Sequence, residues 1–382
     1  MKILLVGEYN QSHKYLKEGL IKLGHEALVV GLTDGFKKID VDIEIKNRYT
    51  QGISKKWRWL LLKVFKIDLY SLDVKKQILN LQSHLSGYDI VQFINESSFI
   101  CRPKIEREIF DLLVDWNGKA FLLSCGTDYT SVKYAFEKKF KYSILTPYFE
   151  GRLPEHNYSL GLKYLKPEFK ALHEHIFKRI SGVISSDLDY YMPLKDHDKH
   201  LGLIPHPINT DVITYQPLQI EDKIVILHGI NRNNYYKKGN DVFEKALAVI
   251  HKIYADKIDI ITVESLPYKA YIKTFEKAHI LLDQVFSYDQ GYNALEAMAK
   301  GKVVFTGAEQ EWLDYYQLKE DTVAINALPD PNLIVKKLEW LILHPEVLQN
   351  ISTNARAFVE QEHHYVTCAE ESLKVWKNAK SS

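Results

Sequence analysis

HILLDQVFSYDQGYNALEAMAKGKVVFTG, residues 279–307, is the stretch that decides the predicted fold. An apolar run of strand length is followed by a polar loop, a stretch of helical periodicity and a second apolar run rich in valine. A strand, a crossover helix and another strand form the repeating unit of a parallel β-sheet. One acid, Glu296, lies near the predicted start of the helix, on an otherwise apolar face. The stretch therefore predicts a βαβ unit with a carboxylate at its strand-to-helix junction.

The same alternation of apolar runs and amphipathic stretches extends along the chain, with an irregular part at residues 45–80. It pauses at LGLIPHPINTD, residues 201–211, where two prolines flank His206 and disfavour a helix interior or a central strand. We therefore predict an α/β protein with two Rossmann-like, doubly wound parallel-sheet domains that face a central cleft. The predicted domains are residues 1–206 and 207–382. The last helix, at about residues 366–380, is a candidate for crossing back to the first domain.

The composition fits two ordinary globular domains, because the chain has 382 residues of which 46% are apolar. A formal net charge of +1 gives no general argument for nucleic acid as a partner, and no recognition module is visible. The three cysteines form no Cys-x-x-Cys pair, which favours a reducing compartment. The apolar run at the N-terminus is too short for a signal sequence. We therefore expect a cytoplasmic protein.

A basic loop opens the second predicted domain, in ILHGINRNNYYKKGNDVFEKAL, residues 226–247. A predicted strand ends at Gly229, the loop carries Arg232, Lys237 and Lys238, and Gly239 precedes a predicted helix. Positive side chains and free backbone N–H groups at a helix start suit a diphosphate. The alternative is a solvated basic loop, and the loop by itself does not decide between the two.

Residues 286–296 form a second strand-to-helix junction. Gly291 permits a close approach of a ligand to the backbone, and the N–H groups of Tyr292 and Asn293 are expected to point towards that ligand. Glu296, expected in the first turn of the helix, would accept hydrogen bonds from the vicinal hydroxyls of a nucleotide ribose. The alternative is that Glu296 only caps its own helix.

Taken together, the two junctions resemble the nucleotide-sugar-dependent glycosyltransferases of the GT-B fold, most closely the retaining glycosyltransferase family 4. Arg232 and Lys238-Gly239 are similar to the diphosphate loop of that family. LEAMAKGKVV, residues 295–304, is similar to its motif of Glu, seven residues, Glu, then Ala-Met-Ala-x-Gly-x-Pro-Val. The resemblance implies that Arg232 and Lys238 bind the donor phosphates, that the amides of residues 291–293 hold the diphosphate, and that Glu296 binds the ribose.

The motif departs from the family at its first glutamate, which in the family contacts the donor sugar. Tyr288 stands at the matching position, Asp289 is displaced from it by one residue, and Val303 replaces the usual proline. Asp283 lies further upstream, in or near the strand. Tyr288 and Asp289 are our candidates for contacts with the donor sugar.

The first half resembles the same family at fewer positions. GEY at residues 7–9 and LLSCGTDYT at residues 122–130 are similar to its glycine loop and to its His-Gly-Ser-Asp segment, with Cys125 in place of the histidine. His13 is predicted to start a helix that faces the cleft and to contact the acceptor or a phosphate. Asp128 is predicted as an acid on the acceptor side. These two residues are our catalytic candidates, whereas Cys125 is interpreted as a core residue.

Two acid pairs imitate the Asp-x-Asp metal site of the other large glycosyltransferase fold, at Asp40-Val41-Asp42 and Asp187-Leu188-Asp189. A metal site there would leave the second Rossmann-like half without a purpose, so we interpret Asp187 as a helix cap. We therefore expect neither a metal nor a cofactor. The expected co-substrate is a nucleoside diphosphate sugar of the UDP or GDP type.

A basic and aromatic segment, SKKWRWLLLKVFKIDLY, occupies residues 54–70. Such an amphipathic stretch suits the surface of an anionic membrane, where it would make the protein peripheral at the inner face of the cell membrane. The alternative is a helix whose apolar side packs on its own domain while its lysines face water. The sequence leaves both interpretations open.

The function predicted from these features is that of a glycosyltransferase of the hexosyltransferase type. It would move a sugar from a nucleoside diphosphate sugar to a hydroxyl of a glycan or lipid-linked acceptor, in cell-surface polysaccharide synthesis. We expect the reaction to be metal-independent, with retention of the anomeric configuration as the family resemblance implies. The alternatives are a sugar-nucleotide epimerase of related fold and a non-catalytic sugar-nucleotide binding protein.

Overall fold

Two parallel β-sheets organise the chain in the computed structural model, which describes residues 1–32 and 39–380. The first is seven-stranded with the order β3-β2-β1-β4-β5-β6-β7, and the second is five-stranded with the order β12-β11-β10-β8-β9. The first sheet comprises β1 (Lys2–Val6), β2 (Glu26–Gly31), β3 (Ile43–Glu44), β4 (Ile90–Phe93), β5 (Lys119–Ser124), β6 (Gly182–Ser185) and β7 (His200–Leu203). The second comprises β8 (Ile224–Ile230), β9 (Ile258–Glu264), β10 (Ile280–Leu282), β11 (Val303–Thr306) and β12 (Ile325–Asn326). The prediction of an α/β protein with two parallel sheets is confirmed.

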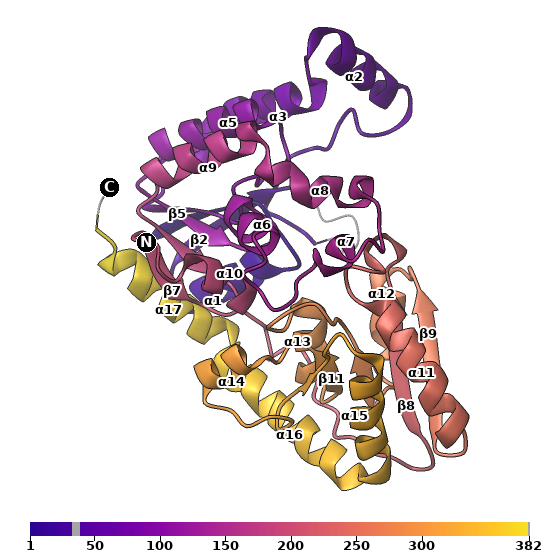
Figure 1. The fold of residues 1–382 in the computed structure, drawn as a ribbon. Coiled ribbons are helices and arrows are strands. Elements are labelled where there is room, and N and C mark those ends of the chain that lie inside the picture. Colours follow the sequence, from indigo (N-terminus) through magenta and orange to yellow (C-terminus); the bar gives the residue numbers. More distant parts are fainter. Residues whose placement is uncertain (33–38, 381–382) are drawn as a thin grey trace.

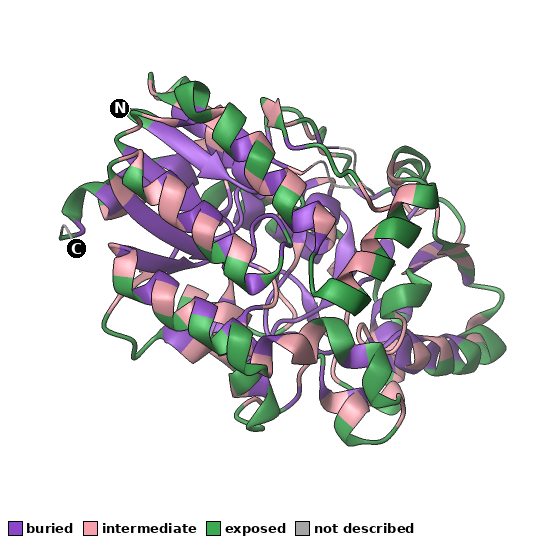
Figure 2. Cartoon of the chain, turned by 90° about the horizontal axis from the view of Figure 1, so that it is seen from above, coloured by how far each residue is buried: buried purple, intermediate pink, exposed green. Residues whose placement is uncertain are grey.

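The first sheet is buried on both faces, which explains why its strands are almost continuously apolar. Leu4 and Val6 of β1 point to one face and pack with residues of α3, α5 and α9, whereas Ile3 and Leu5 point to the other face and pack with α1. Figure 2 shows buried strands between helices whose outer surfaces are exposed. The helical elements of this half are α1 (Ser12–Lys22), α2 (Gly52–Phe65), α3 (Leu69–Asn80), α4 (Gln82–Leu85), α5 (Pro103–Asp115), α6 (Tyr129–Phe136), α7 (Thr146–Phe149), η1 (Glu155–Tyr158), α8 (Ser159–Leu162), η2 (Lys163–Leu165), α9 (Pro167–Arg179) and α10 (Leu188–Leu194).

The stretch at residues 279–307 folds as predicted, into β10, a helix and β11, with Ile280 opposite Val303 in the parallel pair. The helix between them, α13 (Tyr292–Ala299), is almost completely buried, which explains its small residues at 294, 297 and 299. The other elements of this half are η3 (Arg232–Asn234), α11 (Asn240–Tyr254), α12 (Tyr268–Thr274), α14 (Gln310–Tyr316), α15 (Pro331–Leu343) and α16 (Pro345–Glu362).

The last helix, α17 (Tyr365–Asn378), lies against the first half of the chain, where Figure 1 shows it in yellow beside α1. The two helices approach closely because Gly19 has no side chain: a Cβ there would lie 2.3 Å from the carbonyl oxygen of Tyr365. Trp376 is fully buried and donates a hydrogen bond of 3.1 Å to Gln92 of β4. Two segments connect the sheets, and they pair through a parallel bridge between Ile208 and His364.

Helix α2 differs from the other long helices because none of its residues is buried. Figure 1 shows it projecting from the first half, next to α3. The side chains of Trp57 and Trp59 are 58% and 60% exposed. Arg58 of α2 forms an ion pair with Asp68, the residue directly before α3. Most of the apolar side chains of this helix are therefore exposed, and only Leu61 and Leu62 are half-buried.

Candidate functional site

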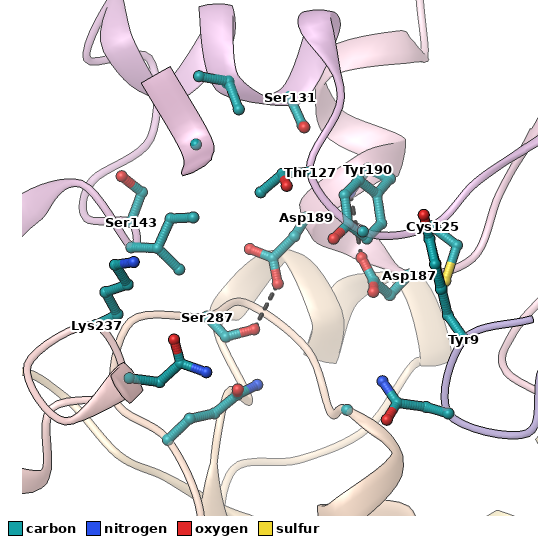
Figure 3. Close-up of a pocket in the computed structure, with 18 of the residues that line it drawn as sticks. Tyr9, Cys125, Thr127, Ser131, Ser143, Asp187, Asp189, Tyr190, Lys237 and Ser287 are labelled. Carbon is teal, nitrogen blue, oxygen red and sulfur yellow. Dashed lines mark hydrogen bonds between the residues drawn. The ribbon is translucent and has the colours of Figure 1, made fainter. Parts of the chain in front are cut away.

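A cavity of about 840 Å³ lies between the two halves. The loops after β1, β4, β5 and β6 line it from the first half, and the loops before α11 and after β10 line it from the second. These loops follow the carboxyl ends of parallel strands, which is where open α/β sheets bind ligands. Figure 3 shows the side chains of both halves converging on this space.

Glu296 binds residues of both halves. Helix α13 begins at Tyr292, one residue earlier than predicted, so Glu296 lies in the second turn and does not cap its own helix. Its side chain is 3% exposed. Oε1 accepts a hydrogen bond of 2.9 Å from Nε2 of Gln11, and Oε2 accepts one of 2.8 Å from the hydroxyl of Tyr268. Because Gln11 belongs to the first half, Glu296 joins the two halves, although it lies outside the cavity lining.

The two predicted phosphate ligands of the basic loop, Lys238 and Arg232, lie in different places. Lys238 lines the cavity, and its Nζ lies 3.1 Å from Oδ1 of Asp283. Gly239 follows with a φ of 74°, and a Cβ there would lie 2.6 Å from Val285, so both the turn and the packing require glycine. Arg232 is exposed, lies outside the cavity lining and pairs with Glu264. The structure therefore places Lys238, but not Arg232, at the cavity.

The two strand-to-helix junctions meet at Asp283, which is almost fully buried at the end of β10. Its Oδ1 accepts hydrogen bonds from Lys238 and, at 2.7 Å, from Nδ2 of Asn293. Gly291 and Tyr292, on the same junction, line the cavity. Of the predicted donor residues, Lys238, Gly291 and Tyr292 therefore line the cavity, whereas Arg232, Asn293 and Glu296 lie outside its lining.

Tyr288 and Asp289, the candidates for sugar contacts, point in different directions. Tyr288 is 1% exposed and lies outside the cavity lining, and its hydroxyl accepts a hydrogen bond of 2.7 Å from the backbone N–H of Lys141 in the first half. Asp289 lines the cavity and accepts hydrogen bonds from the backbone of Leu188 and Gln290. Burial raises the pKa of Asp289 well above its usual value. Only Asp289 is therefore placed to reach a ligand in the cavity.

Two further carboxylates, Asp187 and Asp189, line the cavity from the first half. Asp187 accepts a hydrogen bond from the backbone of Tyr190, as expected for the cap of α10. Asp189 accepts hydrogen bonds from Ser287 and from the backbone of Tyr288, and Figure 3 shows the bond to Ser287 as a dashed line. Burial raises the pKa of both carboxyl groups above their usual range. Among residues 1–32 and 39–380 no group of acids, histidines and cysteines has the arrangement of a metal site.

The predicted catalytic candidates, His13 and Asp128, do not lie in the cavity, which corrects the expectation that His13 faces the cleft. His13 is fully buried, its Nδ1 bonds to the carbonyl of Gly7, and burial lowers its pKa to about 4. Asp128 is 3% exposed and caps α6 through the backbone N–H of Ser131. Both side chains are therefore internal supports of the fold. Cys125 lines the cavity, and burial raises the pKa of its thiol, so it stays protonated.

Other residues of the site had weak sequence signals or none. Lys237 lines the cavity beside Lys238 and was visible only as part of the basic loop. Gln11 and Tyr268 are far from Glu296 in sequence, and neither belongs to the resembling motifs. Pairing between separate loops decides their position, and local periodicity does not report such pairing.

With this geometry in place, comparison with known proteins decides the type of domain. Residues 235–374 match the family model described as "Glycosyl transferase-like". This part of the second half is therefore similar to a glycosyl transferase-like domain. No curated protein matches the chain significantly. The narrower assignment to family 4 remains a prediction.

Solved structures similar to this chain cover both halves. HepE from Anabaena, in complex with UDP and glucose, is 13% identical with a TM-score of 0.59, over 99% of this chain and 100% of that one. Sucrose-phosphate synthase from Thermosynechococcus elongatus is 12% identical with a TM-score of 0.60, over 99% and 98%. A putative UDP-N-acetylglucosamine 2-epimerase from Listeria monocytogenes is 11% identical with a TM-score of 0.56, over 98% and 95%. The predicted GT-B fold is confirmed, and together with the glycosyl transferase-like domain it supports a glycosyltransferase.

Proposed function

We propose that the protein transfers a sugar from a nucleoside diphosphate sugar to an acceptor hydroxyl. One observation carries the proposal: two strand-to-helix junctions, one with Lys238 and one with Asn293, meet at Asp283 beside a cavity between two Rossmann-like halves. A cation and a helix start at such a place match the needs of a diphosphate.

In the proposed donor complex, Lys238 and the backbone N–H groups of residues 291–293 bind the diphosphate, and Glu296 binds the ribose. The ribose hydroxyls would replace the bonds that Gln11 and Tyr268 make to Glu296 in the structure described above. Arg232 would join the phosphates only after leaving Glu264. We propose a UDP or GDP donor without further cofactor, and the UDP present in the HepE complexes favours UDP.

The proposed chemistry rests on stabilising the departing diphosphate, where negative charge develops. The ammonium group of Lys238 and the start of α13 are positive groups at that place. Closure of the two halves would orient the acceptor hydroxyl towards the sugar. We propose retention of the anomeric configuration and no requirement for a metal, on the strength of the family resemblance.

The acceptor side belongs to the first half, and we propose a glycan or lipid-linked acceptor used in cell-surface polysaccharide synthesis. Helix α2 supports a membrane location: its exposed tryptophans accompany Lys55, Lys56 and Lys63, and it contains no acid. An apolar face flanked by cations is complementary to an anionic lipid surface. We propose that the protein attaches there peripherally, at the cytoplasmic face. No helix in the described ranges is long and apolar enough to cross a bilayer.

A sugar-nucleotide epimerase is the second candidate, and a specific observation favours it. Asp187 and Asp189 line the cavity, burial raises the pKa of both carboxyl groups, and carboxyl groups of that kind suit general acid and base roles. One structural neighbour carries the name of a putative 2-epimerase. A non-catalytic binding protein remains the third candidate.

Incubation with UDP-, GDP- and dTDP-sugars separates these candidates. Slow release of free nucleotide supports the transferase, conversion to an isomer supports the epimerase, and binding without turnover supports the third candidate. Glu296→Ala should weaken nucleotide-sugar binding at least tenfold, whereas Glu346→Ala, at an exposed position on α16, should not change it. The proposal fails if no nucleotide sugar raises the melting temperature, or if Glu296→Ala binds as the wild type does.

A further inference from the structure

Positively and negatively charged side chains line different parts of the cavity. Of the described residues that line it, only Lys237 and Lys238 have lysine or arginine side chains, and both belong to the loop before α11. Carboxylates line the cavity elsewhere, at Glu8, Asp187, Asp189 and Asp289. One end of the cavity is therefore suited to an anionic group, and the remainder to a group that donates hydrogen bonds.

The three cations of this loop have different partners. Arg232 pairs with Glu264 on the outer surface, and Lys238 pairs with the buried Asp283. Lys237 is half-buried, and in residues 1–32 and 39–380 its ammonium group has neither an ion pair nor a hydrogen bond. Burial alone lowers its pKa. Lys237 is thus the cation of this loop whose charge is least balanced by the protein.

Lys237 is held in position from the first half. Its Nζ lies 5.2 Å from the ring centre of Tyr158, which is itself 1% exposed. Arg152, in the same segment, donates a hydrogen bond of 2.7 Å to Asp241 in the first turn of α11. Figure 3 shows the side chain of Lys237 extending along the edge of the cavity towards Ser143. An aromatic ring orients an ammonium group without neutralising it, so the charge stays available to a ligand.

We propose that Lys237 binds the diphosphate of the nucleotide sugar, in a phosphate site that the segment at residues 150–158 of the first half completes. This inference rests on the proposed function and changes its ligand set, because Lys237 takes the place that the sequence motif gives to Arg232. A partly desolvated ammonium group gains more from an incoming phosphate than an exposed guanidinium that already has a carboxylate partner.

The test measures UDP binding by calorimetry with the full-length protein. Lys237→Gln should raise the dissociation constant at least tenfold, and Lys237→Arg should recover most of that loss because it restores the charge. Lys245→Gln, on the exposed face of α11, is the matched control and should bind as the wild type does. The dissociation constant of Lys237→Gln should also depend less steeply on salt, since one ionic contact is missing. A purely structural role for Lys237 would not change the salt dependence.

The outcomes separate this inference from the proposed function. If the wild type binds none of UDP, GDP, ADP and dTDP, the proposed function fails. If the wild type binds UDP and folded Lys237→Gln binds it equally well, the inference alone is overturned. It is also overturned if Arg232→Gln weakens binding more than Lys237→Gln does, because Arg232 would then be the main phosphate ligand. Equal melting temperatures of the unliganded variants show that they are folded.

Discussion

Gln11 of the first half donates a hydrogen bond of 2.9 Å to Oε1 of Glu296, the carboxylate proposed to bind the donor ribose. The same side chain therefore contributes to the contact between the two halves and occupies a hydrogen-bonding position that a ribose would use. Donor binding and the contact between the halves are then linked, because both draw on one carboxylate.

Removal of this contact should have opposite effects on stability and on binding. Gln11→Ala leaves a buried carboxylate with one partner fewer, so we expect the free energy of unfolding to fall by about 1–3 kcal/mol. The affinity for UDP should rise about threefold to tenfold, because the ribose no longer competes with the amide. Urea unfolding and calorimetry measure the two quantities. A loss of both stability and affinity would show that Gln11 supports the donor site instead of competing with the donor.

Tyr288 should contribute to stability and not to recognition of the donor sugar. Its hydroxyl accepts a hydrogen bond from the backbone of Lys141 and lies outside the cavity lining. Tyr288→Phe should lower the free energy of unfolding by about 1 kcal/mol, since the partly buried N–H of Lys141 loses its acceptor. The KM for the donor should stay within twofold of the wild-type value. A large increase in KM without a loss of stability would place the hydroxyl against the sugar.

The carboxyl group of Asp189 should make stability depend on pH. Burial raises the pKa of this carboxyl group in the folded protein above the value that it has in the unfolded chain. The folded state therefore holds this proton more tightly, and its contribution to stability is favourable below the unfolded pKa and is lost as pH rises through the folded pKa. Asp189→Asn, which retains hydrogen-bonding groups for Ser287 and Tyr288, should gain about 1–3 kcal/mol relative to the wild type between pH 4 and pH 8. A stability difference that stays constant with pH would contradict this assignment.

Helix α2 should bind anionic vesicles through its exposed aromatic residues. Replacing Trp57 and Trp59 together by alanine should lower partitioning onto phosphatidylglycerol vesicles at least tenfold, with little change in melting temperature because neither side chain is buried. Ile253→Ala, at a position 56% exposed on α11, is the control and should partition normally. Equal binding of the wild type to neutral and anionic vesicles would show that attraction between the lysines and anionic lipid does not contribute to binding.

The sequence was informative where a local pattern determines the structure. Periodicity predicted the strands at residues 280–282 and 303–306 and the helix between them. Gly239 indicated the turn before α11, where the structure has a positive φ. His13 and Asp128 were misplaced because a residue after a strand can point into the cleft or back into the sheet, and only packing decides which. The partners of Glu296 were missed for the same reason, since Gln11 lies in the other half of the chain.

The paired connections between the halves limit how the cleft can open. Ile208 and the segment at His363 exchange backbone hydrogen bonds, at 2.7 Å from Ile208 N to His363 O and 3.1 Å from Tyr365 N to Ile208 O. The chain thus passes between the halves twice at nearly one place, and the two passages are bonded to each other. We expect these two paired segments to act as a hinge that permits rotation to widen or narrow the cavity and resists sliding of one sheet over the other. The lysines before α11 and the loops of the first half would then move apart and return to the same relative position at each turnover.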